Sequence, residues 1–157
     1  MISALTLGPA HSYCYVQAGE RYGVEPNLLM AMSYQESTFK PWLQSRNSNN
    51  TVDLGLMGIN TIHLQELGRY GITAEMLLDP CQNVMAGAFL LKKRVNEYGY
   101  TWRAVGAYHS RTPDLNERYQ LAVYTKWIDL VKRAQSTAQR RPASNGGTFP
   151  DQFASQR

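Results

Sequence analysis

Apolar residues recur at steps of three and four along most of this chain, which is the spacing of one face of an α-helix. The pattern predicts helices over residues 12–22, 26–36, 59–69, 82–98, 101–109 and 115–133. Glycine is the expected residue just past the end of a helix, and Gly23, Gly71 and Gly99 stand in that place. The chain is therefore expected to be mainly α-helical.

The two longest predicted helices have the clearest apolar stripes, and both stripes are expected to face the core. In the helix over 82–98 the stripe consists of Val84, Ala88, Leu91, Val95 and Tyr98. In the helix over 115–133 it consists of Leu121, Tyr124, Ile128 and Val131.

Residues 40–55 break the helical pattern. They are rich in Asn and Ser and contain Pro41, which is typical of a loop or a small hairpin. No segment alternates strongly enough between apolar and polar residues to predict a large sheet. The expected fold class is mainly α with one short hairpin.

Composition indicates one domain. The 157 residues are 43% hydrophobic and 18% charged, which suits a globular fold with a sizeable core. From Ala134 the chain is rich in Gln, Ser, Thr, Arg, Asn, Gly and Pro, which bury too little apolar surface to order it. We expect an N-terminal extension over 1–11, a folded domain over 12–133 and a disordered tail over 134–157.

The charge pattern limits the partners. The formal net charge is +4, and part of this excess lies in the tail, where Arg140, Arg141 and Arg157 oppose only Asp151. Nucleic-acid binding usually needs a concentrated basic face, so no nucleic-acid partner is expected. A weakly basic surface suits an anionic polymer. No apolar run approaches the ~20 residues of a membrane span, and the first residues lack the basic and apolar regions of a signal peptide.

The two cysteines, Cys14 and Cys81, allow two interpretations. In a cytosolic protein they would be buried free thiols, and in an exported protein they could form one disulfide. Two cysteines give no zinc pattern, and His11, His63 and His109 are too far apart in sequence for a helical ligand pair. No metal or cofactor is expected.

Glu36 is the strongest candidate for chemistry. It shares one face of the helix over 26–36 with Leu29 and Met32. Desolvation on such a face favours the protonated carboxyl, which makes a general acid near neutral pH. Asp53 follows in the polar stretch that begins at Arg46. One carboxyl in an apolar setting and one in a polar setting is the pattern of glycoside cleavage.

Each carboxyl also has a plainer interpretation. A lone Glu at the end of an amphipathic helix is usually solvated or ion-paired, and a lone Asp in a polar stretch usually shapes a turn. Other segments change the balance. They are Glu36-Ser37, then Gly55-Leu56-Met57-Gly58-Ile59-Asn60, then Ala107-Tyr108-His109-Ser110, and finally Tyr119.

This ordered series resembles the lysozyme-like lytic transglycosylases that accompany bacterial secretion systems and conjugative pili, and the resemblance covers about residues 12–131. It implies an α+β lysozyme-like fold whose hairpin lines a glycan groove. It implies that Glu36 is the catalytic acid/base, with Ser37 as its neighbour and Tyr119 near it. The residues implied to bind the glycan strand are Ser37, Gly55, Leu56, Met57, Ile59, Asn60, Tyr108, His109 and Tyr119.

The resemblance also implies a location and partners. Cys14 and Cys81 match the cysteine pair of the secretion-associated subgroup, which implies a disulfide and a periplasmic, exported protein. The implied substrate is peptidoglycan, cut between N-acetylmuramic acid and N-acetylglucosamine. Secretion or pilus components are implied partners, and a monomer is expected.

The chain departs from the family at several positions. Gly58 stands where the family usually has Gln, and His109-Ser110 replaces Asn-Ala. The run from Arg46 to Asp53 resembles the hairpin of chicken-type lysozymes, in which an Asp is the second carboxylate. Two routes therefore stay open: a transglycosylase that uses Glu36 alone, and a hydrolase that uses Glu36 with Asp53.

Two further classes are weighed against the enzyme. Loss of the Gln amide at Gly58 favours a weakly active glycan-binding scaffold, whereas Glu36 on an apolar face argues against one. A helical adaptor without a glycan site is the third hypothesis.

Overall fold

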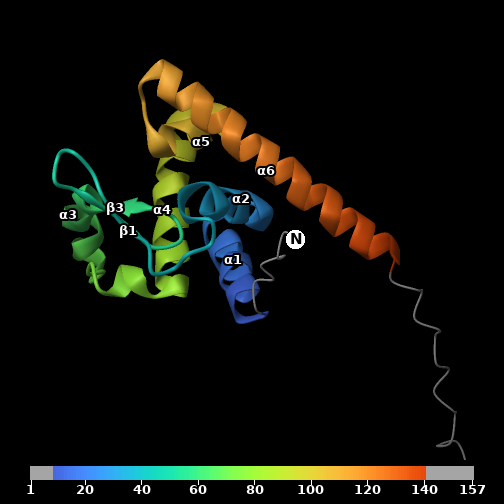
Figure 1. The fold of residues 1–157 in the computed structure, drawn as a ribbon, viewed down its shortest axis with the longest axis horizontal. Coiled ribbons are helices and arrows are strands. Elements are labelled where there is room, and N and C mark those ends of the chain that lie inside the picture. The colour runs from blue at the N-terminus through green and yellow to red at the C-terminus, as the bar shows by residue number, and fades with distance from the viewer. Residues whose placement is uncertain (1–8, 141–157) are drawn as a thin grey trace, which may run out of the picture.

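The computed structural model describes residues 9–140 (Figure 1). Its α-helices are α1 (Pro9–Tyr22), α2 (Pro26–Ser37), α3 (Leu64–Leu67), α4 (Pro80–Tyr98), α5 (Trp102–His109) and α6 (Pro113–Arg140). Its strands are β1 (Gln44–Arg46), β2 (Val52–Leu54) and β3 (Ile59–Asn60), and its 3₁₀ turns are η1 (Thr61–His63), η2 (Gly68–Tyr70) and η3 (Met76–Leu78). The prediction of a mainly α fold with a small hairpin is confirmed.

Helix α4 is the centre of the fold. It runs through the middle of the molecule, with the strands and α3 on one side and α1 and α2 on the other (Figure 1). Helices α1 and α5 pack against it, and α6 packs against α2 and α5. The core contains fully buried side chains from α1, α2, α4 and α6, namely Tyr15, Leu29, Met32, Leu91 and Val123. This packing fixes the end of α2, where Glu36 lies.

The sheet has the order β1-β2-β3 and is antiparallel throughout. Asp53 pairs with Ser45 on one side and with Asn60 on the other. Asn50 adopts the left-handed backbone conformation, with φ 65°, in the turn between β1 and β2. Asn tolerates that conformation better than most residues, so the Asn-rich run suits a hairpin turn.

The prediction of one helix over 59–69 was wrong. Ile59–Asn60 forms β3, and only Leu64–Leu67 is α-helical, between two 3₁₀ turns. The Asn60 side chain accepts a hydrogen bond from the Ile62 backbone N–H at 3.0 Å, so helical turns start after the strand. The predicted end holds, because Gly71 follows η2 in the left-handed conformation.

The prediction for the last helix was wrong in two respects. Leu121 and Tyr124 are 66% and 43% exposed, whereas Tyr119 and Val123 are buried, so the face that packs on the core is a different one. The helix also continues to Arg140, so residues 134–140 are helical and do not belong to a disordered tail. The remainder of the predicted tail, 141–157, and most of the predicted extension lie outside the described residues.

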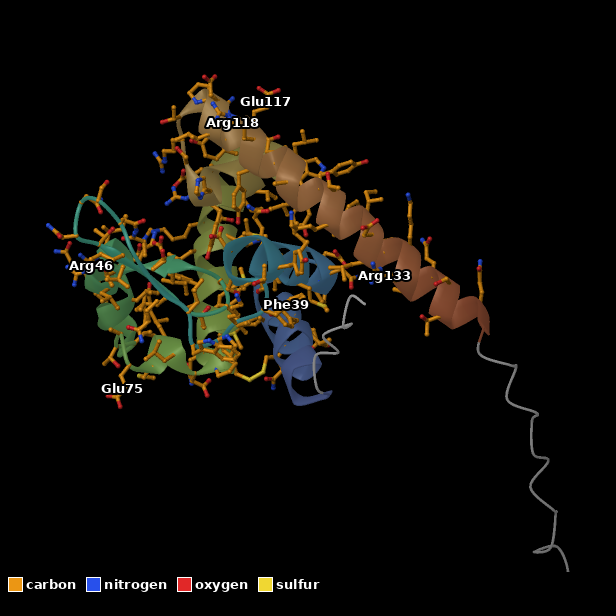
Figure 2. The ribbon with its side chains drawn as sticks, in the orientation of Figure 1. Phe39, Arg46, Glu75, Glu117, Arg118 and Arg133 are labelled. Carbon is orange, nitrogen blue, oxygen red and sulfur yellow. A yellow bond between two sulfur atoms is a disulfide. The ribbon has the colours of Figure 1, made fainter. Side chains whose placement is uncertain are left out.

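Exposed charges are spread over the molecule. Arg46 on β1, Glu75 before η3 and the side chains of Glu117, Arg118 and Arg133 on α6 point outward at separate places (Figure 2). Charges of both signs thus share the described surface. None of the described helices is long and apolar enough to cross a membrane.

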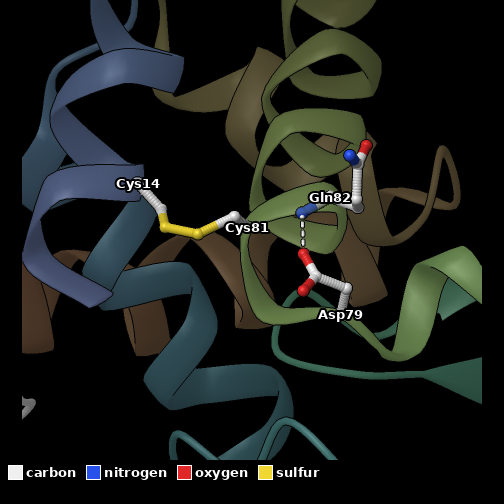
Figure 3. The surroundings of a disulfide bond; sticks show 4 residues. All are labelled: Cys14, Asp79, Cys81 and Gln82. Atoms are coloured by element: carbon white, nitrogen blue, oxygen red, sulfur yellow. Dashed lines mark hydrogen bonds between the residues drawn. A yellow bond between two sulfur atoms is a disulfide. The ribbon is translucent and has the colours of Figure 1, made fainter. Parts of the chain in front are cut away.

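A disulfide joins Cys14 on α1 to Cys81 at the start of α4, with 5.2 Å between the Cα atoms (Figure 3). The predicted pairing is confirmed. Asp79 caps α4 beside it, since its carboxylate accepts a hydrogen bond from the Gln82 N–H at 2.9 Å. The disulfide therefore ties the first helix to the capped end of the central one.

Replacing both Cys14 and Cys81 with Ser is expected to lower the free energy of unfolding by about 2–4 kcal/mol. The bond closes a loop of 67 residues, and opening such a loop raises the entropy of the unfolded chain. Urea unfolding monitored by circular dichroism measures the change. The wild type should lose the same free energy of unfolding when it is reduced, and it should contain no free thiol before reduction. Both results together attribute the effect to the disulfide bond. Unchanged stability after reduction would contradict the prediction.

Candidate active site

A cleft of about 540 Å³ lies beside the small sheet and contains both candidate carboxyls. Its walls come from the end of α2, the hairpin, β3 with η1, helix α4, the end of α5 and the start of α6. The predicted site residues that line it are Glu36, Asp53, Ile59, Asn60, Tyr108 and His109. Residues far apart in sequence thus meet at one cavity.

Glu36 is held at the cleft by the way α2 begins and ends. The helix begins at Pro26, where the Glu25 carboxylate caps it by accepting hydrogen bonds from the next N–H groups. Leu29 and Met32 are fully buried, and the helix stops at Thr38 in the left-handed conformation, with φ 50°. The last turn therefore exposes the Glu36 carboxyl to the cleft while its stem stays against the core.

The Glu36 carboxyl holds its proton unusually well. Burial raises its pKa from the ordinary 4.5 to about 7, because the charged form loses hydration. The Tyr119 hydroxyl lowers the pKa in part, and the negative charge of Asp53 raises it further. A carboxyl with a pKa near 7 can donate a proton and take it back at neutral pH, as a general acid and base must.

Tyr119 is buried close to Glu36 and does not line the cleft. Its hydroxyl is buried and makes no hydrogen bond of standard geometry to the described residues. It still lowers the pKa of Glu36, but by less than burial raises it. Burial and the Glu36 charge raise the pKa of Tyr119 well above its ordinary value, which keeps it a donor. His109 stacks on its ring, with centroids 4.9 Å apart.

Asp53 is held by two amide groups, one on each oxygen. Asn47 donates to Oδ2 at 3.0 Å, and Asn60 donates to Oδ1 at 2.7 Å. The pairing of β2 with both neighbouring strands fixes the backbone on either side. The cleft therefore combines an acid that keeps its proton with a second carboxyl whose two oxygens are held in place.

Besides Tyr119, four predicted binding residues lie outside the cleft lining. Ser37 is buried, and its hydroxyl lies 2.9 Å from the Leu56 carbonyl oxygen. Leu56 and Met57 are buried in the core, and Gly55 packs directly on the Asn83 side chain. These residues hold the loop that forms one wall, so their position suits a supporting role and not contact with a ligand.

The loop over 55–58 requires glycine at both ends. Gly55 and Gly58 have φ values of 69° and 55°, which side chains rarely tolerate. A Cβ on Gly58 would also stand 2.7 Å from a carboxyl oxygen of Glu36. Gly58 therefore lines the cleft with backbone alone and leaves the space beside the acid open.

Sequence reasoning missed the polar residue that organises this loop. Asn83 on α4 is fully buried, accepts a hydrogen bond from the Met57 N–H at 2.7 Å and donates to the Leu54 and Leu77 carbonyl oxygens. Its side chain satisfies three backbone groups at once. Asn inside an apolar helical stripe was the available signal.

Several cleft residues were also not predicted. They include Asn47, Ile62, His63, Leu90, Arg94 and Leu115. Asn47 lies in the segment that the pattern predicted as a loop or small hairpin. Ile62 lies in the segment that the pattern assigned to one helix. Arg94 had no distinguishing motif around it on α4.

Tyr108 connects the cleft to the loop behind it. Its hydroxyl donates to the Met57 carbonyl oxygen at 2.8 Å, while its ring lines the cleft.

Among the described residues, no group of three or more His, Cys, Asp and Glu side chains could hold a metal ion. The groups that the cleft presents include the two carboxyls and the polar side chains around them.

A family model of the transglycosylase SLT domain matches residues 13–124. The chain belongs to this family. It is a lytic transglycosylase, an enzyme that cleaves peptidoglycan, as the ordered motifs predicted.

Named relatives align over most of the transglycosylase. Invasion protein IagB of Salmonella typhimurium is 37% identical over 135 residues, which is 83% of this chain and 84% of the relative. Protein IpgF of Shigella flexneri is 33% identical over 132 residues, 81% of this chain and 87% of its own length.

A solved structure supports the lysozyme-like fold. An inactive mutant of the lytic transglycosylase Slt from Pseudomonas aeruginosa superposes with a TM-score of 0.67 at 18% identity. The match covers 81% of this chain but only 25% of that one, so it concerns the fold of a single domain.

Tyr119→Phe is expected to move the alkaline limb of the cleavage rate to higher pH. The hydroxyl favours the charged form of Glu36, so its removal raises the pKa of the acid above about 7. The rate of release of soluble fragments from cell walls, measured from pH 5 to 9, gives the limb. Tyr124→Phe, at an exposed position on α6, is the matched control. A shift to lower pH would contradict the prediction.

Proposed function

We propose that the transglycosylase cuts the β-1,4 bond between N-acetylmuramic acid and N-acetylglucosamine, with Glu36 as the acid and base. The observation that carries this proposal is the pKa of Glu36, about 7, on the wall of an open cleft. A carboxyl that is half protonated at neutral pH can serve both steps of the reaction.

In the first step the protonated Glu36 donates its proton to the glycosidic oxygen as the bond to the anomeric carbon breaks. Positive charge then develops at that carbon. In the second step the Glu36 carboxylate takes the proton from the 6-hydroxyl of the same muramic acid, and the oxygen closes a 1,6-anhydro ring. No water is consumed, so the product has an anhydro end.

The other predicted site residues have supporting roles in this proposal. Ile59, Asn60, Tyr108 and His109 contact the glycan strand, because they line the cleft. Ser37, Gly55, Leu56 and Met57 place the loop beside Glu36, and Tyr119 adjusts the pKa of the acid.

A second candidate is a hydrolase of the lysozyme type. The observation that favours it is Asp53, which lies in the same cleft with both oxygens hydrogen-bonded. There, Asp53 would stabilise the positive charge or bond to the anomeric carbon, and water would complete the reaction. The products would then have reducing ends.

A weakly active scaffold receives less support. Gly58 lacks the Gln amide, but the space that it leaves is open beside Glu36. Glu36 itself has a perturbed pKa that binding alone does not require.

The biological setting that we propose is the periplasm, where the enzyme opens the cell wall locally for a secretion or pilus apparatus. One support is the disulfide, which persists in oxidising compartments. Another is the likeness to Invasion protein IagB. Components of that apparatus are the proposed partners of a monomeric enzyme.

Mass analysis of the fragments released from purified peptidoglycan tests the proposal. Anhydro ends are expected, and a product mixture made only of reducing ends would favour the hydrolase. A cell-wall zymogram without any clearing would favour the scaffold. Binding of the inactive protein to glycan strands would then separate a scaffold from a helical adaptor.

A further inference from the structure

Arg94 places a positive charge in the cleft that the cleavage chemistry does not use. It projects from α4 and lines the same cavity as Glu36 and Asp53. Its side chain is only 15% exposed. The sugar rings of a glycan strand are uncharged, whereas a guanidinium binds most strongly to an anion, so a charged group elsewhere on the ligand suits Arg94.

Only part of the Arg94 guanidinium is engaged by protein. Nη1 donates to both carboxylate oxygens of Glu97, at 2.7 and 2.9 Å. Nε and Nη2 make no hydrogen bond to any residue of the described part of the chain, and neither is a buried, unsatisfied atom. Arg94 therefore has donors left for a ligand.

The Glu97 carboxylate does not neutralise Arg94 fully. The same carboxylate accepts a hydrogen bond from Arg111 Nη2 at 2.7 Å, so two guanidiniums share one negative charge. Lys93 nearby is paired with Glu66. Arg94, Arg111 and Glu97 together therefore carry a net positive charge, and Arg94 is the one of the three that lines the cleft.

His63 extends the polar surface beside Arg94. It lines the cleft from η1, and burial together with the Arg94 charge lowers its pKa. The imidazole is therefore neutral at neutral pH, and it can donate one hydrogen bond without adding charge. Arg94 and His63 thus both line the cleft, the first as a charged donor and the second as a neutral one.

We propose that Arg94 binds a carboxylate on the muramic acid substituent of peptidoglycan and so makes the cleft selective for charged, substituted strands. The inference rests on the assignment of this cleft as the glycan site. Muramic acid carries its substituent through a lactyl ether, and the attached peptide stem bears free carboxylates. The planar fork of Arg matches a carboxylate with two parallel hydrogen bonds.

Two sources of the carboxylate need separating. In strands with peptide stems the lactyl group is an amide, and the free carboxylates belong to the peptide. In strands stripped by an amidase the peptide is absent, and the lactyl group itself becomes a carboxylate. A hexamer of N-acetylglucosamine has neither, so it reports on contacts with the sugar rings alone.

The test compares binding of these ligands to Glu36→Gln protein, in which cleavage is blocked, with and without Arg94→Gln. We expect Arg94→Gln to weaken binding of uncrosslinked strands with peptide stems about 10-fold, as loss of a hydrogen bond to a charged group does. Binding of the neutral hexamer should stay unchanged. Titration calorimetry measures all three ligands.

Arg111→Gln is the matched control. It removes the other guanidinium that pairs with the Glu97 carboxylate. Arg111, however, is 61% exposed and does not line the cleft. Binding should not change, whereas an equal effect of both variants would show that only the general field matters and would overturn the proposal. Arg94→Lys should recover part of the affinity, since it keeps the charge but not the fork.

The remaining outcomes also decide. An effect confined to strands with stems places the carboxylate on the peptide, and an effect confined to stripped strands places it at the lactyl group. An effect on both would mean that Arg94 reaches either carboxylate. Equal weakening for the neutral hexamer would mean that Arg94 only shapes the cleft, which overturns the proposal. If the Glu36→Gln protein binds none of the ligands, the site assignment fails, and the inference fails with it.

Discussion

Glu36→Gln is expected to lower the rate of peptidoglycan cleavage by about 10²–10⁴-fold, the usual contribution of a positioned acid. The amide has the size of the carboxyl but delivers no proton to the glycosidic oxygen. Release of soluble fragments under saturating substrate measures the rate. A rate within a few-fold of the wild type would remove Glu36 from the catalytic role.

The same variant is expected to be more stable than the wild type at alkaline pH. Folding raises the pKa of Glu36 from 4.5 to about 7, so ionisation costs the native state stability as the pH rises through this window. Above pH 7 the cost approaches about 3 kcal/mol, and below pH 4.5 it vanishes because the carboxyl is protonated in both states.

Urea unfolding at pH 4 and at pH 8 measures this difference. Glu36→Gln should raise the free energy of unfolding at pH 8 and leave it nearly unchanged at pH 4. Glu75→Gln, at an exposed position, is the control and should show no such gain. A gain of equal size at both values of pH would mean that the amide packs better, and the burial of a charged acid would not be the cause.

The helical part of the fold was predictable because most helices here have an apolar face and a clear stop. Helix α2 shows this, with Pro26 at its start and Leu29 and Met32 buried where the spacing places them. Helix α6 was less predictable. Two apolar stripes compete on it, and only tertiary packing selects the one that contains Val123 and leaves Leu121 exposed.

The segment after the hairpin could not be predicted from its own pattern. Ile59 and Asn60 have the spacing of a helix start, but β3 forms because its partner β2 lies alongside. Pairing between strands is a non-local interaction, so it does not appear in a window of a few residues. The same limit hid the contact of Asn60 with Asp53.

Within the site, the sequence indicated the residues that stand in recognisable motifs. It missed residues that stand in no motif and line the cleft only because of the fold. Glu36, Asp53 and Tyr108 stand in recognisable segments and line the cleft. Arg94 is one of several basic residues on α4, and only the three-dimensional structure shows that it faces the cavity. Ser37 illustrates the opposite error, since its motif predicted ligand contact and its hydroxyl lies in the interior.

Asp53→Asn is expected to lower turnover about 10-fold or more, with little change in KM. An anion in the cleft stabilises positive charge at the anomeric carbon, and this charge grows only toward the transition state. If the lysozyme route contributes, the share of reducing ends among the products should also fall. Initial rates with mass analysis of the products measure both effects.

The structure also predicts that Asp53→Asn lowers stability, and the experiment must separate this loss from the effect on turnover. Each Asp53 oxygen accepts an amide hydrogen, from Asn47 and from Asn60, whereas an Asn at this position offers only one oxygen. The variant should therefore lose about 1 kcal/mol of stability. Rates are best compared well below the melting temperature of both proteins.

Asp79→Asn is the matched control, since it makes the same substitution at the cap of α4, away from the cleft. It should change stability little, because Asn and Asp cap helices about equally well, and it should leave turnover intact. Near-normal turnover for Asp53→Asn despite its loss of stability would mean that Asp53 only shapes the hairpin. Glu36 would then act alone, and the anhydro product would follow from a site with one working carboxyl.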